Sequence, residues 1–292
     1  MQIIHQVKDM HSLSRLLRVS DQSIGFVPTM GALHEGHLSL IRRSKQENDV
    51  TVVSIYVNPL QFGKNEDFEK YPRQREKDIE MLSSVEADTV FIPEDNDMFG
   101  EHDTTFINIG EIGNILCGAS RPGHFDGVAN IVAKLFNIVS PDIAYFGQKD
   151  FQQSVIIKKL VRELKYGIDI IVCPTVREPD GLAMSSRNRY LTEAERKAAP
   201  LLYKALKHGR NLILSENIND PSSIKKELET MLKAEPLADL KYVEILNPES
   251  FVPVNKIELP VIICLAAAFG KARLIDNMVI TKEAPSQNNC AL

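Results

Sequence analysis

The stretch FVPTMGALHEGHLSL, at Phe26–Leu40, passes from an apolar run into a glycine-containing turn and then into a new apolar pattern with helical spacing. Gly31 marks the break after the apolar run, and His34 and His37 stand directly before the helical pattern. The first N–H groups of a helix have no intrahelical partner, and the helix dipole favours negative charge there. Imidazole can add a hydrogen-bond donor or a positive charge. We therefore expect a strand, a turn and a helix start that grip the phosphates of a nucleotide.

The same turn has a simpler interpretation as an ordinary strand-to-helix connection with two surface histidines. Its small residues favour a function instead, because Thr29, Gly31 and Gly36 all stand in it. Gly36 in particular carries no Cβ that would hold a phosphate away from the backbone.

Outward from this turn, apolar β-branched runs alternate with helical patterns over residues 1–175. Strands are expected at 24–27, 50–57, 89–92, 143–146 and 168–172, and helices at 35–48, 73–85, 127–139 and 151–164. Strands separated by helices indicate βαβ units and a mostly parallel, Rossmann-like sheet. Ligands of such sheets bind beyond the carboxyl ends of the strands. The G-x-G-x-x-G fingerprint is absent, so a nicotinamide cofactor is not indicated.

The pattern changes after about Val176. Helices are expected at 193–214 and 221–234, the second opened by Asp220 and Pro221 as cap and first residue. Strands follow at 240–246, 261–268 and 273–280 with no helix between them. Residues 176–282 are therefore predicted to form a smaller α+β domain with an antiparallel sheet, after a first domain at 1–175. The polar residues 283–292 are expected to be a disordered tail.

Bulk properties exclude several classes of function. The net charge of −5 argues against nucleic-acid binding, which needs a basic face. The longest apolar run, at 261–269, is too short to cross a bilayer, and no secretory signal pattern opens the chain. The cysteines are widely spaced and form no C-x-x-C pair, which favours reduced thiols in a cytoplasmic protein: Cys117, Cys173, Cys264 and Cys290.

Two further motifs carry amides or an imidazole. Asn58 and Gln61 follow a strand, and their amides suit a hydroxyl or a carboxylate, although Asn58-Pro59 could equally be a plain turn. His124 stands with an arginine and glycines in a loop that enters a helix, where a functional role and a simple connection are equally compatible with the pattern.

Two more motifs carry cations. Lys149 can supply a point charge to phosphate, and Asp150 can cap a helix or bind a ribose hydroxyl or Mg²⁺. Arg187 follows two serines in a loop that includes the turn Asp180-Gly181, which is interpreted as flexible. A guanidinium and hydroxyls suit phosphate oxygens, and a solvated loop with a helix cap is the alternative.

Taken together, these motifs resemble those of the pantothenate synthetase family, nucleotidyltransferases that join pantoate to β-alanine with ATP. The chain matches the family's P-T-M-G-A-L-H-x-G-H-L-S-L at 28–40, and then N-P-x-Q-F, R-P-x-H-F-x-G-V, F-G-x-K-D-x-Q-Q and R-E-x-D-G-L-A-M-S-S-R-N in order. Class I aminoacyl-tRNA synthetases and other adenylyltransferases share the first motif but do not combine it with the amide motifs. Gln148 stands at a variable position, the C-terminal domain matches only loosely, and the tail after Thr281 has no clear counterpart.

The resemblance implies a cytoplasmic ATP-dependent ligase that forms a pantoyl adenylate and then pantothenate. It implies His34, His37, Lys149 and Arg187 as catalytic residues. ATP would be bound by Met30, Gly31, Ala32, Leu33, His34, Glu35, Gly36, His37, Gly147, Gln148, Lys149, Asp150, Val176, Met184, Ser185, Ser186 and Arg187. Pantoate and β-alanine would be bound by Gln61, Gln153, Asn58 and His124. Mg²⁺ would bridge phosphate oxygens, with Asp78 and Asp150 as candidate ligands, and the family is typically homodimeric.

Two other functions stay open on the sequence alone. An adenylyltransferase acting on a phosphate ester would share the histidine turn but would not need the pair of Gln61 and Gln153. A catalytically silent nucleotide-binding regulator would bind ATP without turnover.

Overall fold

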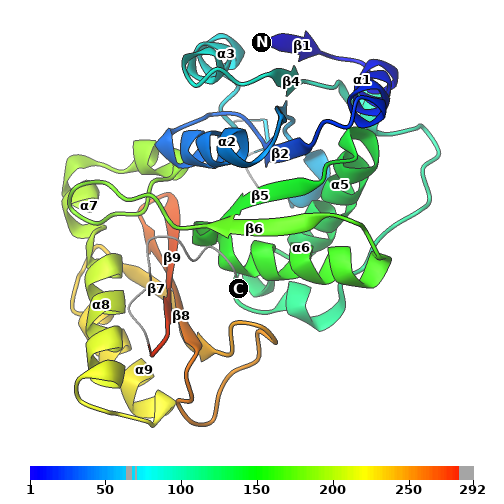
Figure 1. Cartoon of the computed structure of the whole chain (residues 1–292). Helices are drawn as coiled ribbons and strands as arrows, with labels where there is room; N and C mark the ends of the chain where they lie inside the picture. Colours follow the sequence, from blue (N-terminus) through cyan, green and yellow to red (C-terminus); the bar gives the residue numbers. More distant parts are fainter. Residues whose placement is uncertain (64–67, 70, 283–292) are drawn as a thin grey trace. The chain divides into compact units, whose positions relative to one another are not determined.

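The computed structural model describes residues 1–63, 68–69 and 71–282 and divides into two compact units (Figure 1). The first unit comprises Met1–Gly147 and Gln152–Cys173, and the second comprises Gln148–Phe151 and the chain from Pro174 onward. The short segment Gln148–Phe151 therefore belongs with the second unit, although the chain on both sides of it belongs to the first. The tail expected at 283–292 lies outside the described residues.

The first unit is built on a six-stranded sheet with the order β1-β4-β3-β2-β5-β6, in which every pair of neighbours is parallel. Its strands are β1 (Gln2–Ile4), β2 (Ile24–Thr29), β3 (Val50–Ile55), β4 (Thr89–Phe91), β5 (Ile143–Gly147) and β6 (Asp169–Cys173). The Rossmann-like parallel sheet that the sequence predicts is confirmed. The strand order reverses between β2 and β5, and such a switch point is where open α/β sheets bind ligands.

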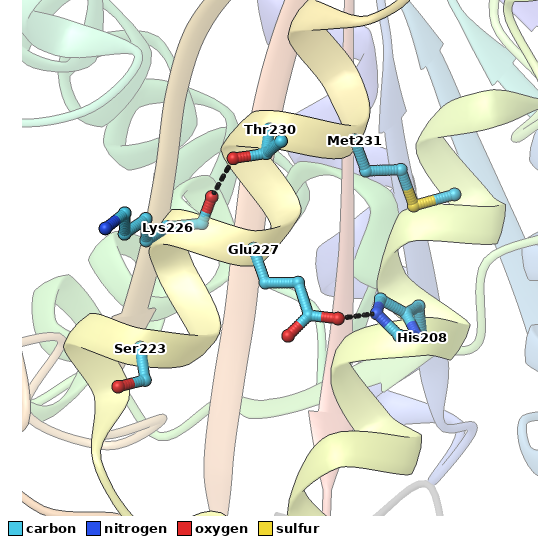
Figure 2. A pocket seen from close by; sticks show the side chains of 6 residues that line it. All are labelled: His208, Ser223, Lys226, Glu227, Thr230 and Met231. Atoms are coloured by element: carbon cyan, nitrogen blue, oxygen red, sulfur yellow. Dashed lines mark hydrogen bonds and ion pairs between the residues drawn. The ribbon is translucent and has the colours of Figure 1, made fainter.

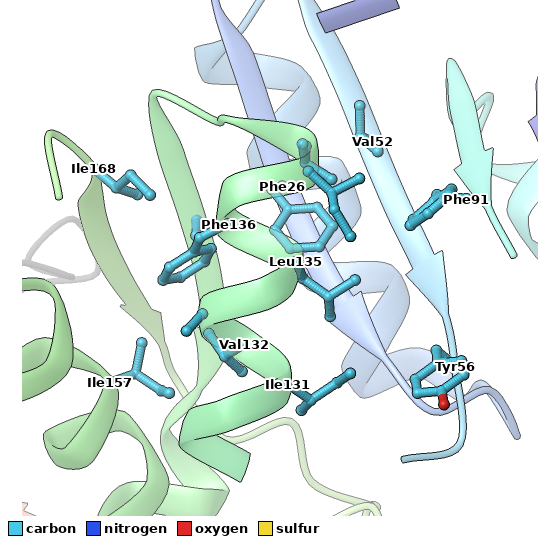
Figure 3. Packing of buried hydrophobic residues seen from close by; sticks show 14 of the residues in the cluster. Phe26, Val52, Tyr56, Phe91, Ile131, Val132, Leu135, Phe136, Ile157 and Ile168 are labelled. Carbon is cyan, nitrogen blue, oxygen red and sulfur yellow. The ribbon is translucent and has the colours of Figure 1, made fainter. Parts of the chain in front are cut away.

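Helices cover both faces of this sheet, which is why its strands are apolar on both sides. They are α1 (Val7–Val19), α2 (Glu35–Glu47), α3 (Arg75–Ser84), α4 (Asp95–Met98), α5 (His124–Val139) and α6 (Phe151–Leu164). Figure 3 shows one face, where Phe26 and Val52 of the strands pack against Leu135 and Phe136 of α5. The rings of Phe26 and Phe136 meet edge to face, with centroids 6.4 Å apart. Val27, the next residue of β2, belongs to the cluster on the other face, as strand alternation requires.

The second unit contains a three-stranded antiparallel sheet in the order β7-β8-β9. Its strands are β7 (Asp239–Leu246), β8 (Val261–Phe269) and β9 (Ala272–Ile280), and its helices are α7 (Glu193–Ala198), α8 (Leu201–Leu214) and α9 (Pro221–Lys233). The predicted antiparallel α+β region is confirmed, and Asp220 caps α9 as expected, accepting the N–H groups of Ser222 and Ser223.

Several details differ from the sequence expectation, among them the short helix α4, which was not expected. The single helix expected at 193–214 is two helices, because Pro200 has no N–H to donate and stands as the cap of α8. β1 and α1, before residue 24, were not expected from the apolar pattern, since β1 has only three residues at the sheet edge. No helix among the described residues is long and apolar enough to cross a membrane.

Candidate active site

Two of the predicted functional segments leave neighbouring strands of the first unit at the same edge of the sheet. Met30–His37 follows β2, and Asn58–Gln61 follows β3, with which β2 is paired in parallel. Asn58 caps the 3₁₀ turn η1 (Pro59–Gln61). Because both strands end at the carboxyl edge, the predicted nucleotide turn at 30–37 lies next to the segment Asn58–Gln61, which is called the amide corner below.

The turn after β2 is held in a left-handed backbone conformation by Asp78. Gly31 has φ of 77° and Ala32 has φ of 50°, a region that residues other than glycine rarely adopt. The two carboxylate oxygens of Asp78, on α3, accept the N–H groups of Ala32 and Leu33 at 2.9 Å each. Thr29 Oγ1 accepts the N–H of Gly31 at 3.1 Å. Asp78 is 1% exposed, and both of its oxygens accept backbone N–H groups, which does not favour it as an Mg²⁺ ligand.

The two histidines form a reciprocal cap at the start of α2. His34 Nδ1 accepts the N–H of Gly36 at 3.1 Å, and His37 Nδ1 accepts the N–H of His34 at 3.3 Å. The ring centroids are 4.2 Å apart. Since both Nδ1 atoms are acceptors, each neutral ring carries its proton on Nε2. The expectation that the first N–H groups of this helix point at phosphate is therefore wrong for His34 and Gly36, whose N–H groups are bonded to imidazole nitrogens.

Both polar atoms of the Gln61 side-chain amide form hydrogen bonds within the protein. Its Nε2 donates to Met30 Sδ at 2.7 Å, and its Oε1 accepts from Asn58 Nδ2 at 3.2 Å. Asn58 is itself buried: its Nδ2 also donates to the carbonyl of Gly127 at 3.0 Å, and its Oδ1 accepts the N–H of Leu60 at 3.2 Å. The side-chain polar atoms of Asn58 thus form hydrogen bonds within the protein and fix the conformation of the corner that carries Gln61.

His124 and Arg121 hold the backbone of the same corner. His124 Nδ1 lies 2.8 Å from the carbonyl oxygen of Gln61, and Arg121 Nη2 donates to that oxygen at 3.2 Å. Arg121 Nη1 lies 3.0 Å from His124 Nε2, and because arginine is only a donor, Nε2 is the acceptor. Nδ1 therefore carries the proton and donates to Gln61. The residue pattern alone left the role of His124 open, and the resemblance assigned it to pantoate or β-alanine. Neither singled out Arg121, although the R-P-G-H-F run contains both.

A tyrosine at the end of β3 completes this edge. The Tyr56 hydroxyl donates to Asp95 Oδ1 at 2.7 Å. Burial, and then the bond to Asp95, raises the pKa of Tyr56 well above its usual range. Tyr56 therefore stays protonated at neutral pH and supports the edge as a fixed donor.

The close approach of α5 to this corner depends on Gly127. A Cβ at this position would lie 2.2 Å from the carbonyl oxygen of Leu60 and 2.7 Å from the backbone nitrogen of Gln61. Gly127→Ala is therefore expected to push the corner outward, lowering the free energy of unfolding by about 1–3 kcal/mol. It should also raise the KM for the acid substrate that the resemblance implies roughly 10-fold or more, through misplacement of Gln61. Thermal unfolding and steady-state kinetics measure the two effects.

The matched control for that prediction is Gly167→Ala. Its Cβ would meet no atom within 4 Å and its φ is not positive, so unchanged stability is expected. An unchanged KM for that acid in Gly127→Ala would show that the position of this corner does not govern its binding.

The paired glutamines of α6 have different environments. Gln152 is buried, accepts the N–H of Cys117 at 3.2 Å, and donates to the carbonyls of Ile112 and Ile115 at 2.9 Å. Gln153, which the family motif assigns to pantoate, is only partly buried. Gln152 is thus structural, and Gln153 is the member of the pair with exposed surface.

Two of the remaining predicted ATP-binding residues belong to the first unit: Gly147 ends β5, and Glu35 is exposed and pairs with Arg42. The others lie in two segments of the second unit. Gln148–Asp150 forms the 3₁₀ turn η4, in which Lys149 Nζ lies 3.6 Å from Asp150 Oδ2. The other segment is the loop 176–188, whose predicted contact residues are all partly buried: Val176, Met184, Ser185, Ser186 and Arg187.

The loop 176–188 is braced at its turn. Gly181 has φ of 94°, and its N–H donates to the carbonyl of Glu178 at 2.8 Å. Arg196 of α7 donates to both Asp180 and Glu178, and its guanidinium lowers the pKa of Asp180. Asn188 donates to Glu178 at 3.0 Å. The Asp180-Gly181 turn, which was expected to be flexible, is therefore held to α7 by ion pairs.

The described residues contain no group of three or more His, Cys, Asp or Glu side chains placed to hold a metal ion. The three cysteines in this part of the chain, Cys117, Cys173 and Cys264, are thiols that form no disulfide with one another.

A shallow groove of about 740 Å³ lies elsewhere, between α8 and α9 of the second unit (Figure 2). It is lined by His208, Ser223, Lys226, Glu227, Thr230 and Met231, and His208 pairs with Glu227 at 2.6 Å. It includes none of the residues that the sequence assigns to substrates.

Comparison with known proteins finds similarity to one family over nearly the whole chain. The family described as Pantoate-beta-alanine ligase matches residues 2–279. A pantothenate synthetase from Caldicellulosiruptor bescii is 50% identical over 280 residues, which is 96% of this chain and 99% of that protein.

Solved structures show the same fold. The crystal structure of pantothenate synthetase from Thermus thermophilus is 39% identical, with a TM-score of 0.90 over 96% of this chain and 100% of that one. The pantoate-beta-alanine ligase of Francisella tularensis, complexed with beta-gamma ATP and beta-alanine, is also 39% identical, with a TM-score of 0.79 over 98% of this chain and 100% of that one. With the motifs in order and the match extending almost from end to end, the chain belongs to the pantoate–β-alanine ligase family.

Proposed function

We propose that this member of the pantoate–β-alanine ligase family condenses pantoate with β-alanine in an ATP-dependent reaction through pantoyl adenylate. The observation that carries the proposal is the contact between Gln61 and Met30. It joins the amide that the family motif assigns to pantoate to the first residue of the turn assigned to ATP. A carboxylic acid bound at Gln61 would thereby be close to the nucleotide phosphates, which is the positioning that an adenylation requires.

The first step would be attack of a pantoate carboxylate oxygen on the α-phosphorus of ATP. A new P–O bond forms, the bond to the β-phosphate oxygen breaks, and pyrophosphate leaves. The Nε2–H groups of His34 and His37 are donors suited to charge that develops on the phosphate oxygens. The family motifs assign Lys149, Ser185, Ser186 and Arg187 to the same triphosphate, as a point charge, two hydroxyl donors and a guanidinium.

In the second step the amine of β-alanine would attack the acyl carbon of the adenylate. A C–N bond forms, the C–O bond to AMP breaks, and the amine loses a proton. Neither step needs a protein nucleophile, so catalysis would rest on orientation and on stabilisation of phosphate charge. Gln153 is proposed to share pantoate with Gln61, and the backbone of Met30–Leu33 and Val176 to receive the nucleoside.

The proposal includes Mg²⁺, a homodimer and a cytoplasmic location. Mg²⁺ would enter as part of the ATP complex and be held mainly by phosphate oxygens, with Asp150 as the candidate side chain, since Asp78 is occupied by backbone N–H groups. The dimer and the location follow from the family resemblance, and the reduced thiols agree with a reducing compartment.

ATP–pyrophosphate exchange with pantoate and without β-alanine tests this function. Exchange that requires pantoate is expected, because adenylate formation is reversible. Exchange with a nucleotide-like phosphate ester instead of pantoate would indicate another adenylyltransferase. ATP binding with no exchange on any acid would indicate a silent nucleotide-binding regulator.

A further inference from the structure

Two adjacent polar residues stand in the middle of an otherwise largely apolar strand of the second unit. β9 reads ARLIDNMVI, and Asp276 and Asn277 within it are 3% and 4% exposed. Burying a carboxylate and an amide side by side is costly unless each finds partners. Among the described residues β9 is an edge strand of its sheet, with β8 as its one neighbour. The partners of these two side chains therefore indicate what the pair is for.

Asn277 holds the turn that carries Lys149. Its Nδ2 donates to the carbonyl of Gln148 at 2.8 Å and to the carbonyl of Lys149 at 3.0 Å. Its Oδ1 accepts from Gln148 Nε2 at 3.4 Å. One buried amide thus fixes two successive carbonyls of η4. This explains why Gln148–Phe151 groups with the second unit, although it directly follows β5 in the chain.

Asp276 holds the loop 176–188. It pairs with Arg177 through two bonds, to Nη1 at 2.6 Å and to Nη2 at 2.9 Å. Arg177 in turn donates to the carbonyl of Gly181 at 3.1 Å, and its guanidinium lies 3.9 Å from the ring centroid of Tyr203. Asp276 also accepts the N–H of Asn277 at 2.8 Å, so the two anchors are bonded to each other.

We propose that Asp276 and Asn277 are positioning residues that hold the Lys149 turn and the loop 176–188, which carries Ser185–Arg187, in one fixed relation for ATP. The inference rests on the proposed function, which assigns both segments to the triphosphate. Side chains at successive strand positions point to opposite sides, so neighbouring residues can reach two different segments. The cations that meet the phosphates would then act as one preorganised set, with no ordering needed at the moment of binding.

A double-mutant cycle between Asn277 and Lys149 tests the first anchor. Asn277→Ala removes both donors to the turn, and adenylate formation in single turnovers is expected to fall roughly 10-fold to 100-fold. In a Lys149→Ala background the same substitution should cost almost nothing, because the group that it positions is already gone. Equal losses in both backgrounds would overturn the proposal, since a general loss of structure would act in both. Asn277→Ser, which keeps one donor, should recover part of the rate.

The second anchor has its own cycle. Asp276→Asn should lower the rate in the wild-type background and have little further effect with Arg187→Ala. If Asp276→Asn does not fold, because Arg177 is left as an uncompensated charge, the paired replacement Arg177→Met with Asp276→Leu removes both charges and serves instead. Full activity of that folded pair would refute a positioning role for the ion pair.

The control is Asn211→Ala on α8, where the amide donates to Glu216 and to neither segment. Asn211→Ala should form the adenylate at the wild-type rate. In Asn277→Ala, the KM for pantoate should equal that of the wild type. Calorimetric titration with ATP alone separates this inference from the proposed function. A wild type that shows no pantoate-dependent exchange would refute the function, whereas ATP binding unchanged by Asn277→Ala and Asp276→Asn would refute the positioning role.

Discussion

Replacing His37 with alanine is expected to lower the rate of adenylate formation roughly 10²–10³-fold, the loss that follows removal of one charge-stabilising donor. His37 holds its proton on Nε2 because its Nδ1 accepts the N–H of His34. The substitution therefore removes both a donor and half of the helix cap. Single-turnover formation of pantoyl adenylate, followed with ATP and pantoate alone, measures the effect.

A second substitution at this position separates the two losses. The amide oxygen of His37→Asn can replace Nδ1 as the acceptor for His34, while no donor reaches the position of Nε2. This variant should unfold at the wild-type temperature and yet be about as slow as His37→Ala. His208→Ala, which alters a histidine paired with Glu227 on the second unit, is the matched control and should keep the wild-type rate. An unchanged single-turnover rate in His37→Ala would remove this residue from the mechanism.

Asp78→Ala is expected to lower the free energy of unfolding by about 2–6 kcal/mol. It leaves the N–H groups of Ala32 and Leu33 without an acceptor in a buried site, at about 1–3 kcal/mol each. Relaxation of the left-handed turn should also slow adenylate formation. Denaturant unfolding of the variant and of the wild type measures the first effect, and pantoate-dependent exchange measures the second.

Asp9→Ala provides the comparison, because Asp9 also stands in the first turn of a helix but is exposed. Its effect on unfolding should stay within about 0.5 kcal/mol. If Asp78→Ala kept the wild-type stability and changed the dependence of ATP binding on Mg²⁺ concentration, Asp78 would again be a candidate metal ligand.

The architecture could be predicted because its signals are local. The strands β2, β3 and β5 are apolar on both faces, and the helices between them show helical spacing, so a covered parallel sheet follows from the pattern. Pro200 was present in the sequence as a signal against one long helix, but the apolar spacing on both sides of it favoured continuity. β1 gave no usable signal, because a three-residue strand has no period.

The candidate site was predictable only in its residue types. The turn after β2 and the amides after β3 follow from chain order, but the acceptor for Ala32 and Leu33 is Asp78 on a helix that follows the next strand. Nothing local marks that carboxylate as a support for the turn. The anchoring of Lys149 by Asn277 is likewise a contact between residues 128 apart in the chain. The histidine cap was missed because serine, threonine, aspartate and asparagine are the usual cap residues.

The direct contact between α5 and the Leu60–Gln61 backbone has a consequence for substrate selection. With Gly127 at the contact, the helix position that faces the turn has no side chain that could change rotamer and make room. Surface loops usually yield to a larger ligand, but this corner is wedged against a helix that is buried along most of its length. On the proposed assignment of Gln61 to pantoate, so rigid a wall is expected to discriminate among hydroxy acids by volume, at a cost of about 1–3 kcal/mol for one additional methylene group.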